Sequence, residues 1–169
     1  MKIIIIGDIH GENTWKKIIK KELKNSNKIV FLGDYFDSLN EDLDQIGNFN
    51  EIIQLKELYP KKIQLLIGNH EFHYMKGVRE SYSGYKNKKN FDIQFVIHSA
   101  FDKGLMNVCF QHKDIICSHA GITKTWCEIH NIKINKSLVK NINKLFISNY
   151  NLNFSFNGFN RYGDDITQS

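Results

Sequence analysis

The 169 residues are enough to bury a core, and no linker divides them, which predicts one domain over residues 1–169. The formal charge of +5 comes from lysines spread along the chain without a dense basic run, which argues against nucleic acid as a partner. No apolar stretch approaches the roughly 18 residues of a membrane helix, and the three cysteines are odd in number. We therefore expect a soluble, cytoplasmic protein with reduced thiols.

The first half of the chain alternates short apolar runs with helical patterns. Ile3 to Ile6, Ile29 to Leu32 and Ile63 to Ile67 have the length and composition of buried strands. Between them, residues 14–24 and a segment ending near Tyr59 carry apolar side chains at helical spacing. Asn13 or Thr14 is expected to cap the first helix. Strands that alternate with helices predict an α/β protein with a parallel sheet.

The segment from His73 to Asn90 loses this periodicity and gathers glycine, serine and lysine. Such a composition predicts an exposed excursion over or beside a site at the strand ends. Arg79, Tyr82 and Tyr85 are candidates to contact an anionic ligand there, although residues of these types are also ordinary at protein surfaces.

The second half of the chain predicts a helix, a hairpin and two further helical segments. The helix covers about residues 91–103, and the hairpin joins a strand from Leu105 to Phe110 with another from Asp114 to Ser118. A helical stretch begins with Trp126 and Ile129, and a last amphipathic helix contains Leu138, Ile142, Leu145 and Phe146.

Polar motifs with a glycine follow the first three strands, and a histidine follows the fourth. Because loops after parallel strands meet at one edge of a sheet, these side chains are expected to converge. A single Gly-Asp pair is usually only a turn, but turn chemistry does not require histidine and asparagine to recur at strand ends. The motifs are Gly7-Asp8-Ile9-His10-Gly11, Gly33-Asp34-Tyr35-Phe36-Asp37, Gly68-Asn69-His70-Glu71 and Ser118-His119-Ala120-Gly121.

These motifs predict a site for divalent metal ions. Asp8 and His10 are two residues apart, and in a nearly extended segment that spacing aims both side chains the same way. Asp34, from the next strand, is placed to bridge two ions, while Asn69 and His119 add an amide oxygen and an imidazole. Mixed oxygen and nitrogen donors suit Mn, Fe, Zn, Co or Ni, and geometry alone does not choose among them. We expect Mn.

In this order and combination, the motifs over residues 2 to about 125 resemble those of the calcineurin-like metallophosphoesterases. They are most similar to the phosphoprotein phosphatase branch and its small bacterial and phage relatives. The resemblance implies an α/β fold with a β-sandwich flanked by helices. It also implies one metal held by Asp8, His10 and Asp34, and a second held by Asp34, Asn69, His119 and a further histidine near the C-terminus.

The implied activity is hydrolysis of phosphoric esters, and we favour a phosphomonoesterase similar to the serine/threonine protein phosphatases. Its substrate would be a phosphoprotein or a small phosphoester, attacked by a hydroxide that bridges two metals. His70 is placed to protonate the departing oxygen, and Asp37 to fix the tautomer of His70. Glu71 and His73 are weaker candidates that we expect to be structural.

Two departures from the family pattern bear on activity. Ser38 stands where the phosphoprotein phosphatases have an arginine, so Arg79 or Arg161 would have to replace a phosphate clamp. The histidine of the C-terminal motif also has no counterpart, because His130, the only later histidine, lies in a helical context where we expect it to face solvent. We therefore expect an incomplete second metal site in a truncated or split family member with weak or absent activity.

Two other functions are compatible with the sequence. The same site would suit a phosphodiesterase or a dinucleoside polyphosphate hydrolase. Alternatively, the chain would bind metal without turnover and act as a binding module, which the incomplete ligand set favours.

Overall fold

The computed structural model describes residues 2–78, 82–85 and 90–153. No helix in these ranges is both long and apolar enough to cross a membrane. In chain order the elements are β1 (Ile3–Ile6), α1 (Thr14–Glu22), β2 (Lys28–Phe31), α2 (Gln45–Leu58), β3 (Ile63–Leu66), α3 (Asn69–Phe72), α4 (Asn90–Asp102), β4 (Met106–Asn107), β5 (Cys109–His112), β6 (Ile115–Ser118), α5 (Lys124–Ile129) and α6 (Leu138–Asn153).

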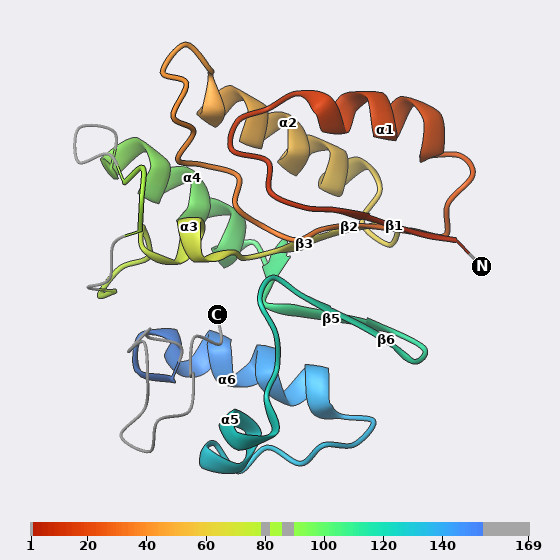
Figure 1. Cartoon of the computed structure of the whole chain (residues 1–169), viewed down its shortest axis with the longest axis vertical. Helices are drawn as coiled ribbons and strands as arrows, with labels where there is room; N and C mark the ends of the chain where they lie inside the picture. Colours follow the sequence, from red (N-terminus) through yellow and green to blue (C-terminus); the bar gives the residue numbers. More distant parts are fainter. Residues whose placement is uncertain (1, 79–81, 86–89, 154–169) are drawn as a thin grey trace.

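Strands β1 to β4 form a parallel sheet in sequence order, and β5 and β6 form an antiparallel pair. Helices α1 and α2 cover one face of the parallel sheet, while the β5–β6 hairpin, α5 and α6 lie on its other side (Figure 1). This mixed α/β architecture is consistent with the metallophosphoesterase fold and confirms the predicted fold class.

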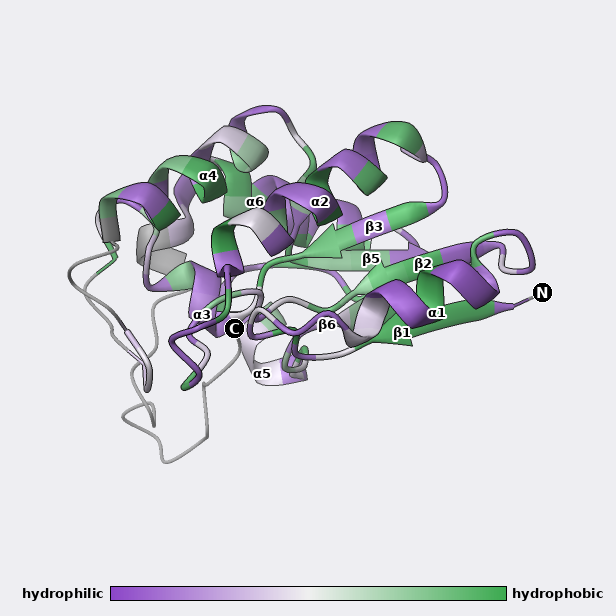
Figure 2. Cartoon of the chain, turned by 90° about the horizontal axis from the view of Figure 1, so that it is seen from above, coloured by the Kyte–Doolittle hydropathy of each residue, from purple (hydrophilic) through white to green (hydrophobic). Residues whose placement is uncertain are grey.

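The two faces of the parallel sheet are buried to different degrees. On the face toward the helices, Ile29, Phe31 and Ile63 are fully buried. On the opposite face, Val30 packs with Cys117 of β6, but Ile5 of the edge strand is 51% exposed. The strands of the parallel sheet are hydrophobic over most of their length when the chain is coloured by hydropathy (Figure 2), and the face toward the helices is the more deeply buried of the two.

The prediction of one continuous strand from Leu105 to Phe110 is wrong, because the chain passes from the parallel sheet to the antiparallel pair at Val108. Met106 pairs with β3 in the parallel sheet, whereas Cys109 pairs with β6. The side chain of Asn143 on α6 stabilises the backbone at this crossing between the two sheets. Its Oδ1 accepts from the backbone N–H groups of Val108, at 3.2 Å, and Cys109, at 3.0 Å, and its Nδ2 donates to the Cys109 carbonyl at 2.9 Å.

Two further expectations are corrected. Asn13 precedes α1, but its side chain makes no capping bond and accepts instead from Asn48 Nδ2 at 2.8 Å. The segment after His73 does not begin as an exposed excursion, since His73, Tyr74 and Met75 are all buried. They follow directly on α3, a short helix that the sequence reasoning did not predict.

Candidate active site

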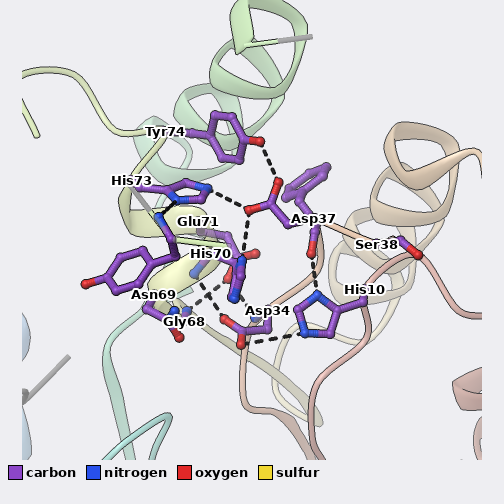
Figure 3. A network of polar contacts seen from close by, with 12 residues as sticks. His10, Asp34, Asp37, Ser38, Gly68, Asn69, His70, Glu71, His73 and Tyr74 are labelled. Carbon is purple, nitrogen blue, oxygen red and sulfur yellow. Dashed lines mark hydrogen bonds and ion pairs between the residues drawn. The ribbon is translucent and has the colours of Figure 1, made fainter. Parts of the chain in front are cut away.

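The predicted site residues lie in four loops or helix starts that directly follow strands. Residues 8 and 10 follow β1, residues 34 and 37 follow β2, residues 69 and 70 open α3 after β3, and residue 119 follows β6. Figure 3 shows how the side chains from β1, β2 and α3 converge. This placement is what loops at the carboxyl edge of a sheet are expected to produce.

Glu71 links the loops after β2 and β3 by hydrogen bonds to their backbone. Its fully buried carboxylate accepts from the backbone N–H groups of Asp34, Tyr35 and Gly68 at 2.8, 2.6 and 2.9 Å. Burial, together with the nearby Asp34 charge, raises the pKa of Glu71 to about 8, although the three N–H donors oppose this. Glu71 thus positions the backbone of both loops, as the structural role expected of it requires.

The backbone around the site is strained. His10, Asp34 and Asp37 adopt positive φ angles of 41°, 54° and 65°, a region that side-chain-bearing residues rarely occupy. Such strain persists only where surrounding contacts enforce it, and it clusters at functional sites. The chain turns at His10 and Gly11, where Glu12 N–H donates to the Ile9 carbonyl at 2.7 Å, so the nearly extended segment expected from Asp8 ends at His10.

Gly68 allows the loops after β2 and β3 to approach each other. A Cβ at this position would lie 2.2 Å from Asp34 Oδ1 and 3.0 Å from His119 Nδ1. No side chain can fit into that space without displacing these two groups, so the glycine is required for the site to close.

Asp34 lies at the centre of the candidate metal ligands. Its Oδ2 is 3.4 Å from His119 Nε2 and 3.9 Å from His10 Nε2. The metal-capable groups that share it are Asp8, Asp34 and His119 on one side, and His10, Asp34 and His70 on the other. Asp8 and His10 thus both reach Asp34, but they belong to different groups.

Each of the two candidate histidine ligands has its Nδ1 occupied by a backbone carbonyl. His10 Nδ1 donates to Phe36 O at 2.5 Å, and His119 Nδ1 donates to Leu32 O at 3.1 Å. In both rings Nε2 is then the acceptor nitrogen and faces Asp34. A backbone partner that fixes the tautomer in this way is typical of metal-ligating histidines.

Asn69 extends this set of acceptors. Its Oδ1 lies 2.9 Å from His119 Nε2. The contact is attractive when a cation touches both atoms, when the imidazole carries a second proton, or when the amide is turned to present its N–H groups. Carboxylate, imidazole and amide donors converging on one point fit a divalent transition metal.

Asp37 lies in a second cluster, beside the first. Its Oδ2 is 2.9 Å from His70 Nδ1 and 2.6 Å from His73 Nε2, and its Oδ1 accepts from the Tyr74 hydroxyl at 2.5 Å (Figure 3). Burial acts to raise the pKa of Asp37, but these donors outweigh it and lower the pKa to about 2. Asp37 is therefore ionised at neutral pH.

His70 gains a proton more readily than an ordinary histidine. Burial acts to lower its pKa, but the hydrogen bond to Asp37 and the charges of Asp34, Asp37 and Glu71 raise it overall. Because Nδ1–H is directed at Asp37, Nε2 is left for chemistry at the site.

Sequence reasoning expected His73 to be structural and did not single out Tyr74, yet both contact Asp37. The signal was present in their spacing. If a helix begins at Asn69, residues 70, 73 and 74 are at i, i+3 and i+4 and share one face.

The other candidates lie at the edge of the site or outside it. Tyr82 and Tyr85 pack against the Asp37 cluster, and the buried Ser38 donates its backbone N–H to Gln45 Oε1 at 3.0 Å. Arg79 and Arg161 fall outside the described residues. His130 does not face solvent freely, because its ring packs 4.6 Å from Trp126 and burial lowers its pKa. It belongs to none of the metal-capable groups found among the described residues.

Comparison with known proteins identifies the class. The family model of the calcineurin-like phosphoesterases matches residues 1–165, and the chain belongs to this family. A probable serine/threonine-protein phosphatase of Encephalitozoon cuniculi is 25% identical over 135 residues, and the serine/threonine-protein phosphatase PP2A-like PPG1 of Saccharomyces cerevisiae is 31% identical over 140 residues. These relatives place the chain with the phosphoprotein phosphatase branch, although the alignments span 78% of this chain and only 29% and 36% of theirs.

Solved structures show a similar fold. A cold-active protein-tyrosine phosphatase of a psychrophilic Shewanella species superimposes with a TM-score of 0.56 at 17% identity, and its I115M mutant with 0.57 at 18%. In both cases the match covers 89% of this chain and 49% of the other. The chain thus spans about half the length of these proteins, and the likeness concerns the fold alone.

Proposed function

We propose that the chain is a metal-dependent phosphoric-ester hydrolase, a phosphomonoesterase similar to the serine/threonine protein phosphatases. The observation that carries the proposal is the convergence on Asp34 of imidazole nitrogens whose other nitrogen is already held by a backbone carbonyl. Membership of the calcineurin-like phosphoesterase family supports it. The substrate class we favour is a phosphoprotein or a small phosphoester.

The proposed cofactors are two divalent ions, with Mn favoured over Fe, Zn, Co and Ni. Asp8, His10 and Asp34 would hold the first, although Asp8 and His10 share only Asp34 among the metal-capable groups, and Asp34, Asn69 and His119 would hold the second. When bound, two such ions lower the pKa of a shared water and stabilise the charge of the transferring phosphoryl group. The first set contains two carboxylates and the second only one, so we expect the first ion to be held more tightly.

His70 is the proposed general acid. With Nδ1–H donated to Asp37, its Nε2 carries the proton that the departing oxygen needs. Asp37 stays ionised, stabilises the protonated imidazole and keeps the ring in one orientation, as the third member of a catalytic triad does.

Turnover of p-nitrophenyl phosphate and of its bis-ester by the Mn-loaded chain tests the reaction class. We expect the monoester to be the better substrate. A strong preference for the diester would indicate a phosphodiesterase instead. Full metal occupancy without hydrolysis of any phosphoester would indicate a binding module. His112→Gln is a suitable control, since His112 lies on β5 at the hairpin, outside every metal-capable group among the described residues.

Metal titration tests the two unequal sites. We expect one tightly held ion per chain and a second that binds more weakly. Two ions held with equal and high affinity, together with rapid turnover, would contradict both this ranking and the expected shortage of ligands at the second site.

A further inference from the structure

Asp37 is shared by two histidines, only one of which the proposed mechanism uses. His70 Nδ1 and His73 Nε2 lie 2.9 and 2.6 Å from the same oxygen, Asp37 Oδ2 (Figure 3). The side chain of His73 is 0% exposed, and so is that of Asp37. A histidine completely buried against a carboxylate that orients a proposed acid is placed to influence that acid.

The protonation pattern of His73 is fixed from its other side. The backbone N–H of Tyr82 donates to His73 Nδ1 at 2.9 Å, so Nδ1 carries no hydrogen. The neutral ring must then carry its hydrogen on Nε2, which faces Asp37. The Nε2–H of His73 therefore lies beside the oxygen that also accepts from His70, in ion-pair contact at 2.6 Å but outside hydrogen-bond geometry.

The segment Tyr82–Tyr85 is packed directly on this cluster. Gly84 has a φ of +85°, and a Cβ there would lie 2.8 Å from Asp37 O and 2.9 Å from Asp37 Cβ. The ring of Tyr85 stacks on that of Tyr74 at 5.1 Å and lies 4.9 Å from the ring of His73. The position of this segment is thus tied to Asp37 through His73, Tyr74 and close backbone contact.

We propose that His73 is a positioning residue for His70: it holds Asp37 in place and couples the segment Tyr82–Tyr85 to the proton donor. A carboxylate held by His70 alone is free to rotate, whereas one that also meets His73 and the Tyr74 hydroxyl has a single orientation. His73 itself belongs to neither of the metal-capable groups that contain Asp34, but shares one with Asp37 and His70. This inference rests on the proposed function.

Three substitutions separate the two contacts of His73. His73→Gln can keep an N–H near the Nε2 position and so retain the contact with Asp37. His73→Asn can keep an acceptor near the Nδ1 position and so retain the bond from Tyr82. His73→Phe fills a similar volume and makes neither contact. His112→Gln serves as the unrelated histidine control.

The first readout is the dependence of turnover on the leaving group. A general acid matters most when the departing oxygen is basic, so phenyl phosphate needs it more than p-nitrophenyl phosphate does. In His73→Phe and His73→Asn we expect turnover of phenyl phosphate to fall about 10- to 100-fold, the usual effect of removing an outer positioning residue, with a much smaller loss on p-nitrophenyl phosphate. In His73→Gln we expect turnover of phenyl phosphate to stay close to that of the parent. Equal losses on both substrates would show a purely structural role and overturn the proposal.

The second readout needs no activity. Long-range proton–nitrogen NMR spectra of the metal-free protein should show His73 with hydrogen on Nε2 and His70 with hydrogen on Nδ1. In His73→Phe we expect His70 to lose this single tautomer. Hydrogen on Nδ1 of His73 in the parent, or an unchanged His70 in His73→Phe, would overturn the proposal. A metal-loaded parent without turnover would refute the proposed function, while these spectra would still decide whether His73 orders Asp37 and His70.

Discussion

Asp34 and Asp37 are three residues apart in one loop, and their surroundings are opposite in kind. Both are buried, both have positive φ angles, and both lie beside histidines. Asp37 is surrounded by groups that can donate, from His70, His73 and Tyr74. Asp34 Oδ2 instead faces the acceptor nitrogens of His10 and His119.

This difference separates a hydrogen-bond network from a ligand set. Asp37 already has the donors that a buried carboxylate requires, so its cluster is stable by itself. Asp34 Oδ1 accepts from the His70 backbone N–H at 3.1 Å, but around Oδ2 the acceptors face one another, an arrangement that a cation makes favourable. Asp8 completes that set from an exposed position, which leaves the Asp34 side accessible while Asp37 is enclosed.

The largest effect should come from Asp34→Asn. The substitution removes the charge that both proposed ions share, so we expect metal affinity to fall by more than the roughly 10- to 100-fold typical of outer residues, and turnover to approach background. Metal analysis after dialysis measures the loss. Asp37→Asn is the matched control and should keep its metal. If Asp34→Asn retained as much metal as the parent, Asp34 would not bridge two ions.

His70→Asn should lower turnover by about 10²- to 10⁴-fold, the usual contribution of general acid catalysis. Metal content should change little, because His70 Nδ1 is engaged by Asp37 and His70 is not one of the proposed ligands, although it shares a metal-capable group with His10 and Asp34. Steady-state kinetics and metal analysis on the same preparation check both points, and Asp37→Asn should cause part of the same kinetic loss. Loss of metal from His70→Asn would make this histidine a ligand.

Gly68→Ala should damage the Asp34 cluster without removing any of its side chains. The added methyl group would lie 2.2 Å from Asp34 Oδ1, so the carboxylate must move. We expect metal affinity to fall about 10- to 100-fold, as when a residue that orients a ligand is lost. Isothermal titration with Mn²⁺ measures it. Gly121→Ala is the control, since a Cβ there meets nothing within 4 Å, and equal affinities in the two variants would contradict the prediction.

The smallest effect concerns acid stability of the metal-free protein. Donors lower the pKa of Asp37 to about 2 from 3.8, so the stability it contributes is fully present above about pH 4 and is lost as the pH falls through 2. Denaturant unfolding at several pH values in this window measures the free energy of unfolding. As the pH falls, this free energy should decline less steeply in Asp37→Asn, which is less stable at neutral pH but has no carboxylate to protonate. Parallel declines would mean that Asp37 is not stabilised as an ion.

Local pattern was enough to predict the first three strands, most of the helices and the order of the site motifs. The apolar runs before Asp8, Asp34 and Asn69 are short and bounded by glycine, and parallel strands align their carboxyl ends. That reasoning needs no knowledge of distant contacts. It also explains why Asp8, Asp34 and Asn69 arrive at one edge of the parallel sheet, whereas His119 arrives from the antiparallel β5–β6 pair; the roles of all four are predictions.

Only the tertiary structure decided how these residues are grouped. The break between β4 and β5 at Val108 depends on Asn143, 35 residues later. The division of Asp8 and His10 between two metal-capable groups depends on the turn at His10, which is enforced by backbone hydrogen bonds to the loop after β2. His73 was assigned to a loop because α3 is too short for a periodic signal, yet its partner Asp37 lies 36 positions earlier in the sequence. Such contacts follow from packing between distant segments, which the period of a single segment does not encode.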